Sequence, residues 1–183
     1  MPYDQGVFIN QFPLAKFFVY HVMYSRVVRD SYRESQLQNE FWTLTIDAHL
    51  LRATINWCMV FGSETEPTHW KHLAEQSESH ARNFRDGLFR ETSLSEVGWQ
   101  EYWTDMKRFR DKWVVHRELE KFSDPVPDFD TALKVAYHYD RWVRNIIYPD
   151  KCTEPPLERF AMSLKESVTP LVDKLLGVTK ELL

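Results

Sequence analysis

The chain has 183 residues, of which 43 % are hydrophobic and 15 % aromatic, and its formal net charge is −4. This amount of bulky apolar surface supports one folded domain over residues 1–183 and excludes global disorder. The negative charge excludes a protein coated with positive charge for non-specific nucleic-acid binding, but it is compatible with a local basic patch.

Hydrophobic periodicity predicts helices along the whole chain, with proline, glycine and capping residues between them. The expected helices cover residues of about 14–33, 40–61, 68–76, 78–89, 96–121, 128–148 and 156–182. No stretch of useful length alternates with the period of two that a strand requires. The sequence therefore predicts an all-α protein, an antiparallel bundle of about five to seven helices in one domain.

Particular residues set the expected helix ends. The first helix should begin after Pro13, and Gly62 should stop the second. Ser93 or Ser95 is a plausible N-cap for the long helix that follows, which the segment Asp124-Pro125-Val126-Pro127 should end. Asp128 or Asp130 can then cap the next helix.

The last segment carries an apolar stripe that resembles a heptad seam. Its members are three or four residues apart: Ala161, Leu164, Val168, Leu171, Leu175, Val178 and Leu182. Thr169-Pro170 interrupts the stripe, either as a kink or as a new helix start. One interpretation is a helix that faces its own core, and the other is a contact between subunits.

Rare residue types exclude several classes of site. The chain has only five glycines, too few for a Gly-rich nucleotide-binding loop, and only two cysteines, Cys58 and Cys152. Two distant thiols indicate neither a secreted disulfide scaffold nor a thiol-based zinc site. The N-terminus lacks a signal-peptide pattern, and no run approaches the roughly 18 apolar residues of a membrane span. We therefore expect a cytoplasmic protein without membrane contact.

The segment most typical of a functional site is the basic, aromatic stretch from Lys107 to Arg117. Within it, Arg110 is followed by the polar residue Asp111 and, after four further residues, by His116. This pattern, near the end of a long helix in an all-α chain, resembles the signature of the HEPN superfamily, particularly its abortive-infection branch. The resemblance implies a HEPN-like bundle, cleavage of RNA without a metal or cofactor, and a homodimer in which two motifs meet.

The chemistry of these residue types suits RNA cleavage. Histidine exchanges protons near neutral pH, so His116 would be the acid or base. Arginine stays charged and offers a planar fork to phosphate, so Arg110 would bind the phosphate. In an ideal α-helix these two side chains lie roughly 60° on either side of Trp113, whereas Asp111 points roughly 160° away from it. Asp111 would therefore need a distorted helix, or a second subunit, to orient either side chain. The alternative is a buried, hydrogen-bonded core histidine with Arg110 in an ion pair.

Four further basic residues surround the motif and are the candidate nucleic-acid-binding residues: Lys107, Arg108, Lys112 and Arg117. Together with Arg110 they form a local cationic cluster that would attract phosphate. The alternative is a solvated helix face, since these residues point in several directions.

Other polar residues stay open in role. His69 and His72 share a helix face, with His80 further on, but spacing fixes no third metal ligand, so we expect no metal site. His49 and His138 lie in other helices. Asp47 and Asp140 sit beside apolar stripes and are expected to form structural salt bridges with arginines.

Two functional classes remain. The first is a HEPN-like, metal-independent endoribonuclease of a defence or toxin–antitoxin type, with RNA, a second copy of the chain and a protein antitoxin as partners. The second is a non-catalytic helical module that binds a partner protein or nucleic acid through the basic helix or the C-terminal seam.

Overall fold

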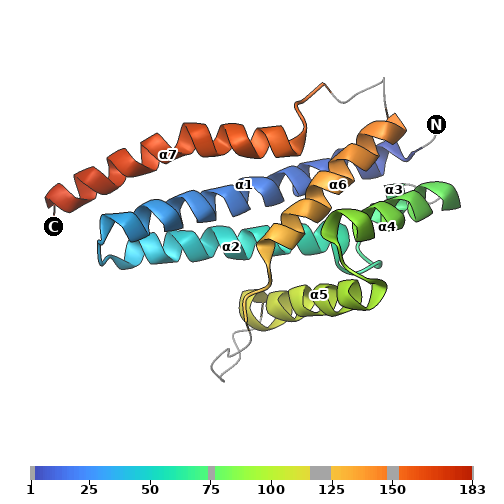
Figure 1. Ribbon diagram of the computed structural model, residues 1–183, viewed down its shortest axis with the longest axis horizontal. Coiled ribbons are helices and arrows are strands. Elements are labelled where there is room, and N and C mark those ends of the chain that lie inside the picture. The colour runs from blue at the N-terminus through green and yellow to red at the C-terminus, as the bar shows by residue number, and fades with distance from the viewer. Residues whose placement is uncertain (1–2, 74–76, 116–124, 148–152, 183) are drawn as a thin grey trace.

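Helices account for nearly all of the regular structure. The structure, a computed structural model, describes residues 3–73, 77–115, 125–147 and 153–182 (Figure 1). Within these ranges no strand occurs, so the predicted all-α class is confirmed. The helices are α1 (Gln5–Ser35), α2 (Glu40–Phe61), α3 (Trp70–Leu73), α4 (Glu78–Thr92), α5 (Glu96–Phe109), the π-helix η1 (Arg110–Val115), α6 (Phe129–Ile147) and α7 (Leu157–Leu182).

The two longest N-terminal helices form an antiparallel pair, and α7 lies along α1 in the same direction as α1 (Figure 1). On the other side of this layer α6 crosses α1, α4 packs against α6, and η1 packs against α2. The main core fills the space between the two layers. A smaller cluster, built from Val27, Val28, Trp42, Val172 and Leu176, closes the far end of the α1–α2–α7 layer.

The start of α1 differs from its prediction. Asp4 caps the helix by accepting a hydrogen bond from the Val7 amide at 3.0 Å, so the helix begins at Gln5 and Pro13 lies inside it. A proline removes one backbone donor without preventing the helix from continuing where packing stabilises it. Ala15 and Phe18, directly after Pro13, are fully buried and supply that packing.

The end of α2 follows the prediction. Gly62 donates its amide to the Cys58 carbonyl at 2.9 Å and closes the helix. A Cβ at this position would lie 2.3 Å from that carbonyl oxygen, so only glycine fits the close approach.

The C-terminal stripe is only half buried, so the interpretation of a helix that faces its own core holds only in part. Ala161 is buried, but Leu171 and Leu175 are 57 % and 48 % exposed. Val172 and Leu176 take the inward positions instead, one residue further along the chain. The helix continues through Pro170. In the second half of α7 the core is therefore contacted by Val172 and Leu176, which lie beside the stripe and not on it.

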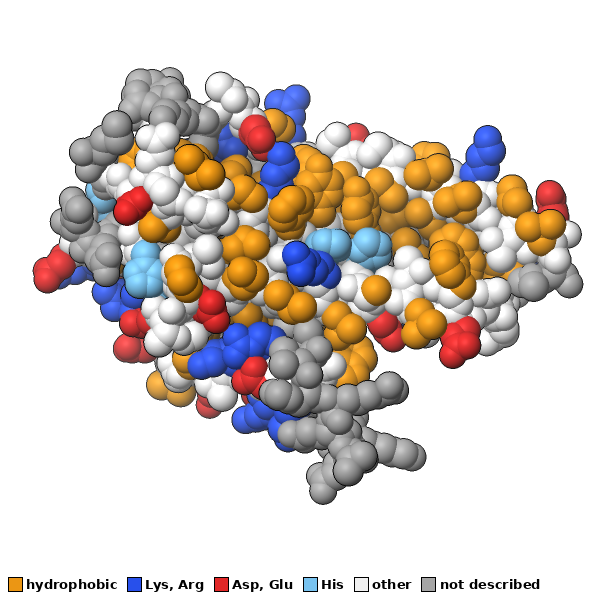
Figure 2. Space-filling model, turned by 180° about the vertical axis from the view of Figure 1, so that it is seen from behind, with side chains coloured by type: hydrophobic (Ala, Val, Ile, Leu, Met, Phe, Trp, Pro, Cys, Tyr) orange, Lys and Arg blue, Asp and Glu red, His pale blue; other side chains and the backbone are white. Residues whose placement is uncertain are grey.

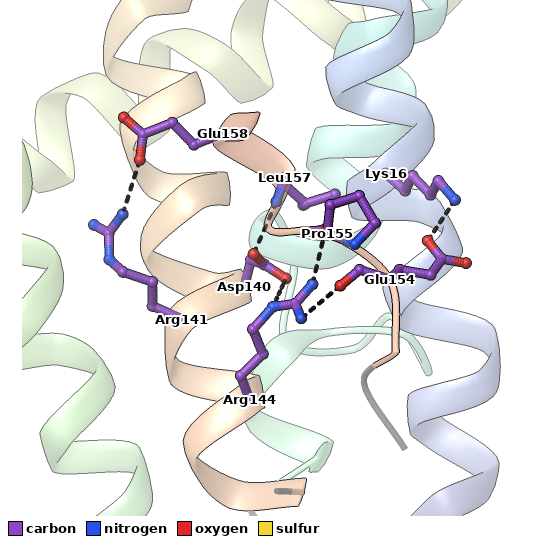
Figure 3. Close-up of polar contacts among 8 residues, drawn as sticks. All are labelled: Lys16, Asp140, Arg141, Arg144, Glu154, Pro155, Leu157 and Glu158. Atoms are coloured by element: carbon purple, nitrogen blue, oxygen red, sulfur yellow. Dashed lines mark hydrogen bonds and ion pairs between the residues drawn. The ribbon is translucent and has the colours of Figure 1, made fainter. Parts of the chain in front are cut away.

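A buried carboxylate ties α6 to the beginning of α7 (Figure 3). Asp140 accepts hydrogen bonds from the Leu157 amide and from Nε of Arg144, both at 2.9 Å. Arg144 also donates to the carbonyls of Glu154 and Pro155. Burial raises the pKa of Asp140 above its usual value, although these partners act in the opposite direction. Asp140 therefore forms a buried salt bridge, but its partner Arg144 lies on the same helix and not on another one as predicted.

No helix in the part of the chain that the structure describes combines the length and hydrophobicity needed to cross a bilayer.

Candidate nucleic-acid interface

The helix that precedes the motif is held on the end of α2. Ser95 caps α5 by accepting a hydrogen bond from Gly98, as the sequence predicts. The indole nitrogen of Trp103 donates to the carbonyls of Phe61 and Gly62, at 2.8 and 3.0 Å. These bonds use carbonyls that the end of α2 leaves without a helical partner, and they fix the position of α5.

The α-helix predicted over 96–121 is confirmed from Glu96 to Phe109, where the α-helical pattern ends, and residues 116–121 lie outside the described part of the chain. The backbone continues from Arg110 to Val115 as a π-helix, the wider helix in which amides bond five residues back. Arg110 marks the change, since its amide reaches the carbonyls of both Met106 and Lys107. Short π segments within helices occur frequently at functional sites. The α-helical angles expected around Trp113 do not apply to this turn.

The motif arginine and its neighbour form a bonded pair. Nε of Arg110 donates to the Asp111 carboxylate at 2.7 Å, and the two side chains are 21 % and 52 % exposed. This hydrogen bond is the main cause of a raised pKa for Arg110, so the guanidinium stays positively charged. Among the described residues, Asp111 is the one hydrogen-bond partner of the Arg110 side chain.

The π-helix lies over a buried thiol. Cys58 of α2 is 1 % exposed, and burial raises its pKa to about 12. The charges that act most strongly on this thiol belong to Arg110, Asp111 and Lys107. A protonated, enclosed thiol is neither a nucleophile nor a metal ligand. Cys58 therefore serves as part of the packing between α2 and η1.

The predicted basic residues are partly neutralised by their surroundings. Lys107 lies over the Trp103 ring, with Nζ 3.8 Å from the ring centroid. Arg108 pairs with Asp105 at 3.2 Å, and Lys112 is half-buried. Residues 105–113 contain four bases and two carboxylates, a net charge of +2. The patch is weaker than the base count indicates, but it is positive on an acidic protein.

His116 and Arg117, two of the predicted site residues, lie outside the described residues. The structure thus brings together Arg110 and Asp111, with Lys107 and Arg108 one turn before them.

A cavity of about 680 Å³ opens next to Trp113. Its lining carries three basic residues, Arg26, Arg29 and Lys165, and four acidic ones, Asp30, Asp47, Asp128 and Asp130. This balance gives no attraction for a phosphate chain, so the positive surface of α5 and η1 is the better candidate interface. Burial raises the pKa of Asp47. Among the described residues no basic group is paired with Asp47, and the salt bridge predicted for it stays a prediction.

The histidines singled out in the sequence do not converge. His69 is buried, and burial together with His72 lowers its pKa to about 4. His80 lies on α4, and His138 bonds through Nε2 to the Phe84 carbonyl at 2.9 Å. In the described ranges, no three or more His, Cys, Asp or Glu side chains are grouped to hold a metal ion.

Sequence reasoning missed a close pair of histidines. His21 of α1 and His49 of α2 are 28 positions apart in the sequence, yet their Nδ1 atoms lie 2.8 Å apart. Only the packing of the two helices brings them together, so no local pattern could have indicated it.

Comparisons with protein-family models, with curated proteins and with solved structures give no match to this chain.

Proposed function

We propose that this protein is a HEPN-like, metal-independent endoribonuclease of a defence or toxin–antitoxin type. The observation that carries the proposal is the hydrogen bond from Arg110 to Asp111 on a π-helical turn at the end of α5. This bond places the Asp111 carboxylate on the Arg110 guanidinium. It supports a role for Asp111 in holding the Arg110 fork in a fixed orientation.

The roles follow from the chemistry of each group. Arg110, oriented through Nε, binds the scissile phosphate with its terminal nitrogens and stabilises charge on the phosphorane. His116 acts as the acid or base, removing a proton from the 2′-hydroxyl or supplying one to the leaving oxygen. Lys107, Arg108, Lys112 and Arg117 attract the RNA backbone. Neither step requires a metal ion.

The assembly that goes with this proposal rests on the resemblance. Two copies of the chain would bring their motifs together, so that RNA lies across both, and a protein antitoxin would restrain the nuclease in the cytoplasm.

The test is incubation of the purified protein with RNA in the presence of a chelator. We expect cleavage products with 2′,3′-cyclic phosphate ends. Arg110→Ala and His116→Ala should each slow cleavage by at least about 100-fold, since each removes a group that acts in the transition state. Arg82→Ala, an exposed arginine on α4, and His72→Ala are the matched controls and should cleave at the wild-type rate.

Equal activity in all four variants would contradict the assignment of the site. Cleavage that stops on addition of the chelator would contradict the metal-independent mechanism. Circular dichroism of each variant separates loss of chemistry from loss of folding.

The second candidate function is that of a helical interaction module, and the exposed stripe of α7 favours it. Figure 2 shows a hydrophobic band along the face of the molecule opposite to the view of Figure 1. Among the exposed large hydrophobic side chains, Leu171, Leu175 and Val178 of α7 and Phe17 of α1 are about half exposed. Apolar bands of this kind mark interaction surfaces. We infer that a second copy of the chain covers the band. The first proposal likewise involves a homodimer.

Light scattering coupled to gel filtration tests this surface. Leu171→Glu combined with Leu175→Glu should convert the wild-type dimer to a monomer, because four charges would enter one symmetric interface. Met162→Glu is the matched control, since Met162 is 63 % exposed on the opposite side of α7 and should leave the dimer intact. If the wild-type protein is monomeric, the proposal that a second copy covers this face is wrong.

A further inference from the structure

A smaller cavity, of about 230 Å³, opens where α3, α4 and α5 meet the end of α2 (Figure 1). Aromatic rings make up much of its lining: Phe61, Trp70, Phe89, Trp99 and Trp103. The first two of these rings are buried, and the other three are half-buried. The volume lies below the roughly 300–1,000 Å³ of pockets that enclose a drug-sized ligand, so the cavity fits a single ring system.

A buried histidine presents an N–H group to this cavity. His69 belongs to the lining and is only 3 % exposed. Its Nδ1 accepts a hydrogen bond from the Lys71 amide at 3.4 Å, so the proton of the neutral ring lies on Nε2. Burial, then His72, lower the pKa of His69 to about 4, which keeps the ring uncharged at neutral pH. In the described part of the chain Nε2 makes no hydrogen bond, and it is not sealed from solvent. The cavity therefore offers an uncharged donor to a ligand.

The charges around the cavity cancel. Lys71 is hydrogen-bonded to Glu64. Arg85 and Glu96 add one positive and one negative charge to the lining. No net charge therefore attracts a phosphate or a carboxylate into the cavity. Gln100 contributes an amide, which both donates and accepts. This lining fits an uncharged, planar, aromatic group that carries hydrogen-bonding atoms on its edge.

The cavity adjoins the positive surface of α5 and η1. Trp103 is part of the lining, and Nζ of Lys107 lies 3.8 Å from the centroid of the Trp103 ring. A nucleobase that entered the cavity would thus keep its phosphate close to Lys107. An apolar side chain of a partner protein would instead leave the His69 N–H unpaired, which costs free energy, and would bring no charge to Lys107.

We propose that this cavity binds one unpaired nucleobase of single-stranded RNA. Trp99 and Phe89 contact the faces of the base. The His69 N–H donates to a ring nitrogen or carbonyl, and the Gln100 amide bonds to the edge of the base. A base in a duplex would have to give up its pairing and stacking to enter, so double-stranded RNA binds less tightly. The proposal rests on the RNA-directed function above, for which it names the form of the substrate.

The experiment measures fluorescence anisotropy of a labelled 2′-O-methyl RNA of about 12 nucleotides, titrated with the full-length protein. Its blocked 2′-hydroxyls prevent cleavage. The single strand should bind at least about tenfold more tightly than the same oligomer in a duplex. His69→Phe, which keeps a ring but removes the donor, and Gln100→Ala should each weaken binding to the single strand about three- to tenfold. Trp99→Ala should weaken it at least about fivefold, through loss of stacking.

The matched controls are Thr104→Ala, an exposed residue of α5 outside the lining, and Phe41→Ala, a ring that is 63 % exposed on α2. Both should bind the oligomer as the wild type does. Urea unfolding checks the folding of the variants at His69 and Trp99. Gln100 is exposed, so Gln100→Ala keeps the fold and tests the cavity by itself. Wild-type affinity in Gln100→Ala and in folded His69→Phe, or equal affinity for single strand and duplex, overturns the proposal.

A photo-cross-link locates the base. The same oligomer with 4-thiouracil at one position should attach on irradiation to a peptide that contains Trp99 or Trp103. Cross-links confined to other elements overturn the proposal, even where the oligomer binds. Because this oligomer cannot be cleaved, the two functions fail separately. Binding that depends on Gln100 in a protein that cuts no RNA would contradict the nuclease and support the base site.

Discussion

At Gly87, in the interior of α4, the missing side chain makes room for an imidazole. A Cβ at this position would lie 2.2 Å from Cε1 of His138, whose Nε2 bonds to the Phe84 carbonyl. Because a carbonyl only accepts, Nε2 carries the proton and Nδ1 the lone pair. Glycine within a helix costs about 1 kcal/mol relative to alanine. The position of the His138 ring offsets that cost.

Gly87→Ala should therefore destabilise the protein, by about 1–3 kcal/mol in urea unfolding, because the buried ring must move and lose its hydrogen bond. Gly177→Ala in α7 is the matched control, since its Cβ would meet no atom within 4 Å. That change should stabilise by about 0.5–1 kcal/mol. Equal stabilisation by both substitutions would show that the ring at Gly87 moves aside freely.

Single contacts decide where the helices meet one another. Asp140 joins α6 to the start of α7, and Trp103 joins α5 to the end of α2. Each contact satisfies backbone groups at a helix end, so the ends are fixed relative to a neighbouring helix. The arrangement of α7 and α5 depends on these buried polar bonds as well as on apolar packing.

Asp140→Asn tests this at the α6–α7 junction. Asparagine keeps the shape but removes the charge opposite Arg144, which should lower the free energy of unfolding by about 2–4 kcal/mol. The measurement is urea unfolding followed by circular dichroism. Asp86→Asn, an exposed aspartate on α4, is the control and should change stability by less than about 0.5 kcal/mol. Wild-type stability in Asp140→Asn would mean that the carboxylate contributes nothing at this junction.

Local signals in the sequence predicted most helix ends correctly. Gly62, Ser95 and the turn before Phe129 act within a few residues of themselves, so their effect is visible in the sequence. The prediction that the first helix begins after Pro13 was wrong, because burial of the surrounding residues outweighs the loss of the backbone N–H at proline. In the candidate site, the residue types were evident, but the π-helical turn, which packs against α2, gave no signal in the sequence. The same holds for His21 and His49.

Across the whole molecule, burial suppresses the protonation of several histidines. The pKa of His21 and of His69 falls to about 4, and the pKa of His49 and His138 is lowered as well. The unfolded chain titrates its histidines near 6.5. Between these values the unfolded state binds more protons than the folded state. The free energy of unfolding should therefore rise as the pH increases from about 4 to about 6.5.

His69 provides the clearest test, because it is only 3 % exposed. Its contribution to the difference in unfolding free energy between pH 5 and pH 7 should be on the order of 2 kcal/mol. Urea unfolding of His69→Gln at both pH values should show a difference smaller by that amount. Asp47 and Asp140, whose pKa values are raised, act in the opposite direction in both proteins and cancel in the comparison. An unchanged difference would mean that His69 protonates freely in the folded state.

The rate at which the enclosed Cys58 thiol is alkylated would report how often η1 separates from α2. Alkylating reagents attack thiolates, and this sulfur is covered and protonated while η1 stays packed on α2. With Cys152 replaced by serine, Cys58 is the remaining cysteine, and its labelling rate would measure how often the packing of η1 on α2 opens. RNA bound to η1 would lower this labelling rate. Binding at the interface could therefore be measured without any cleavage taking place.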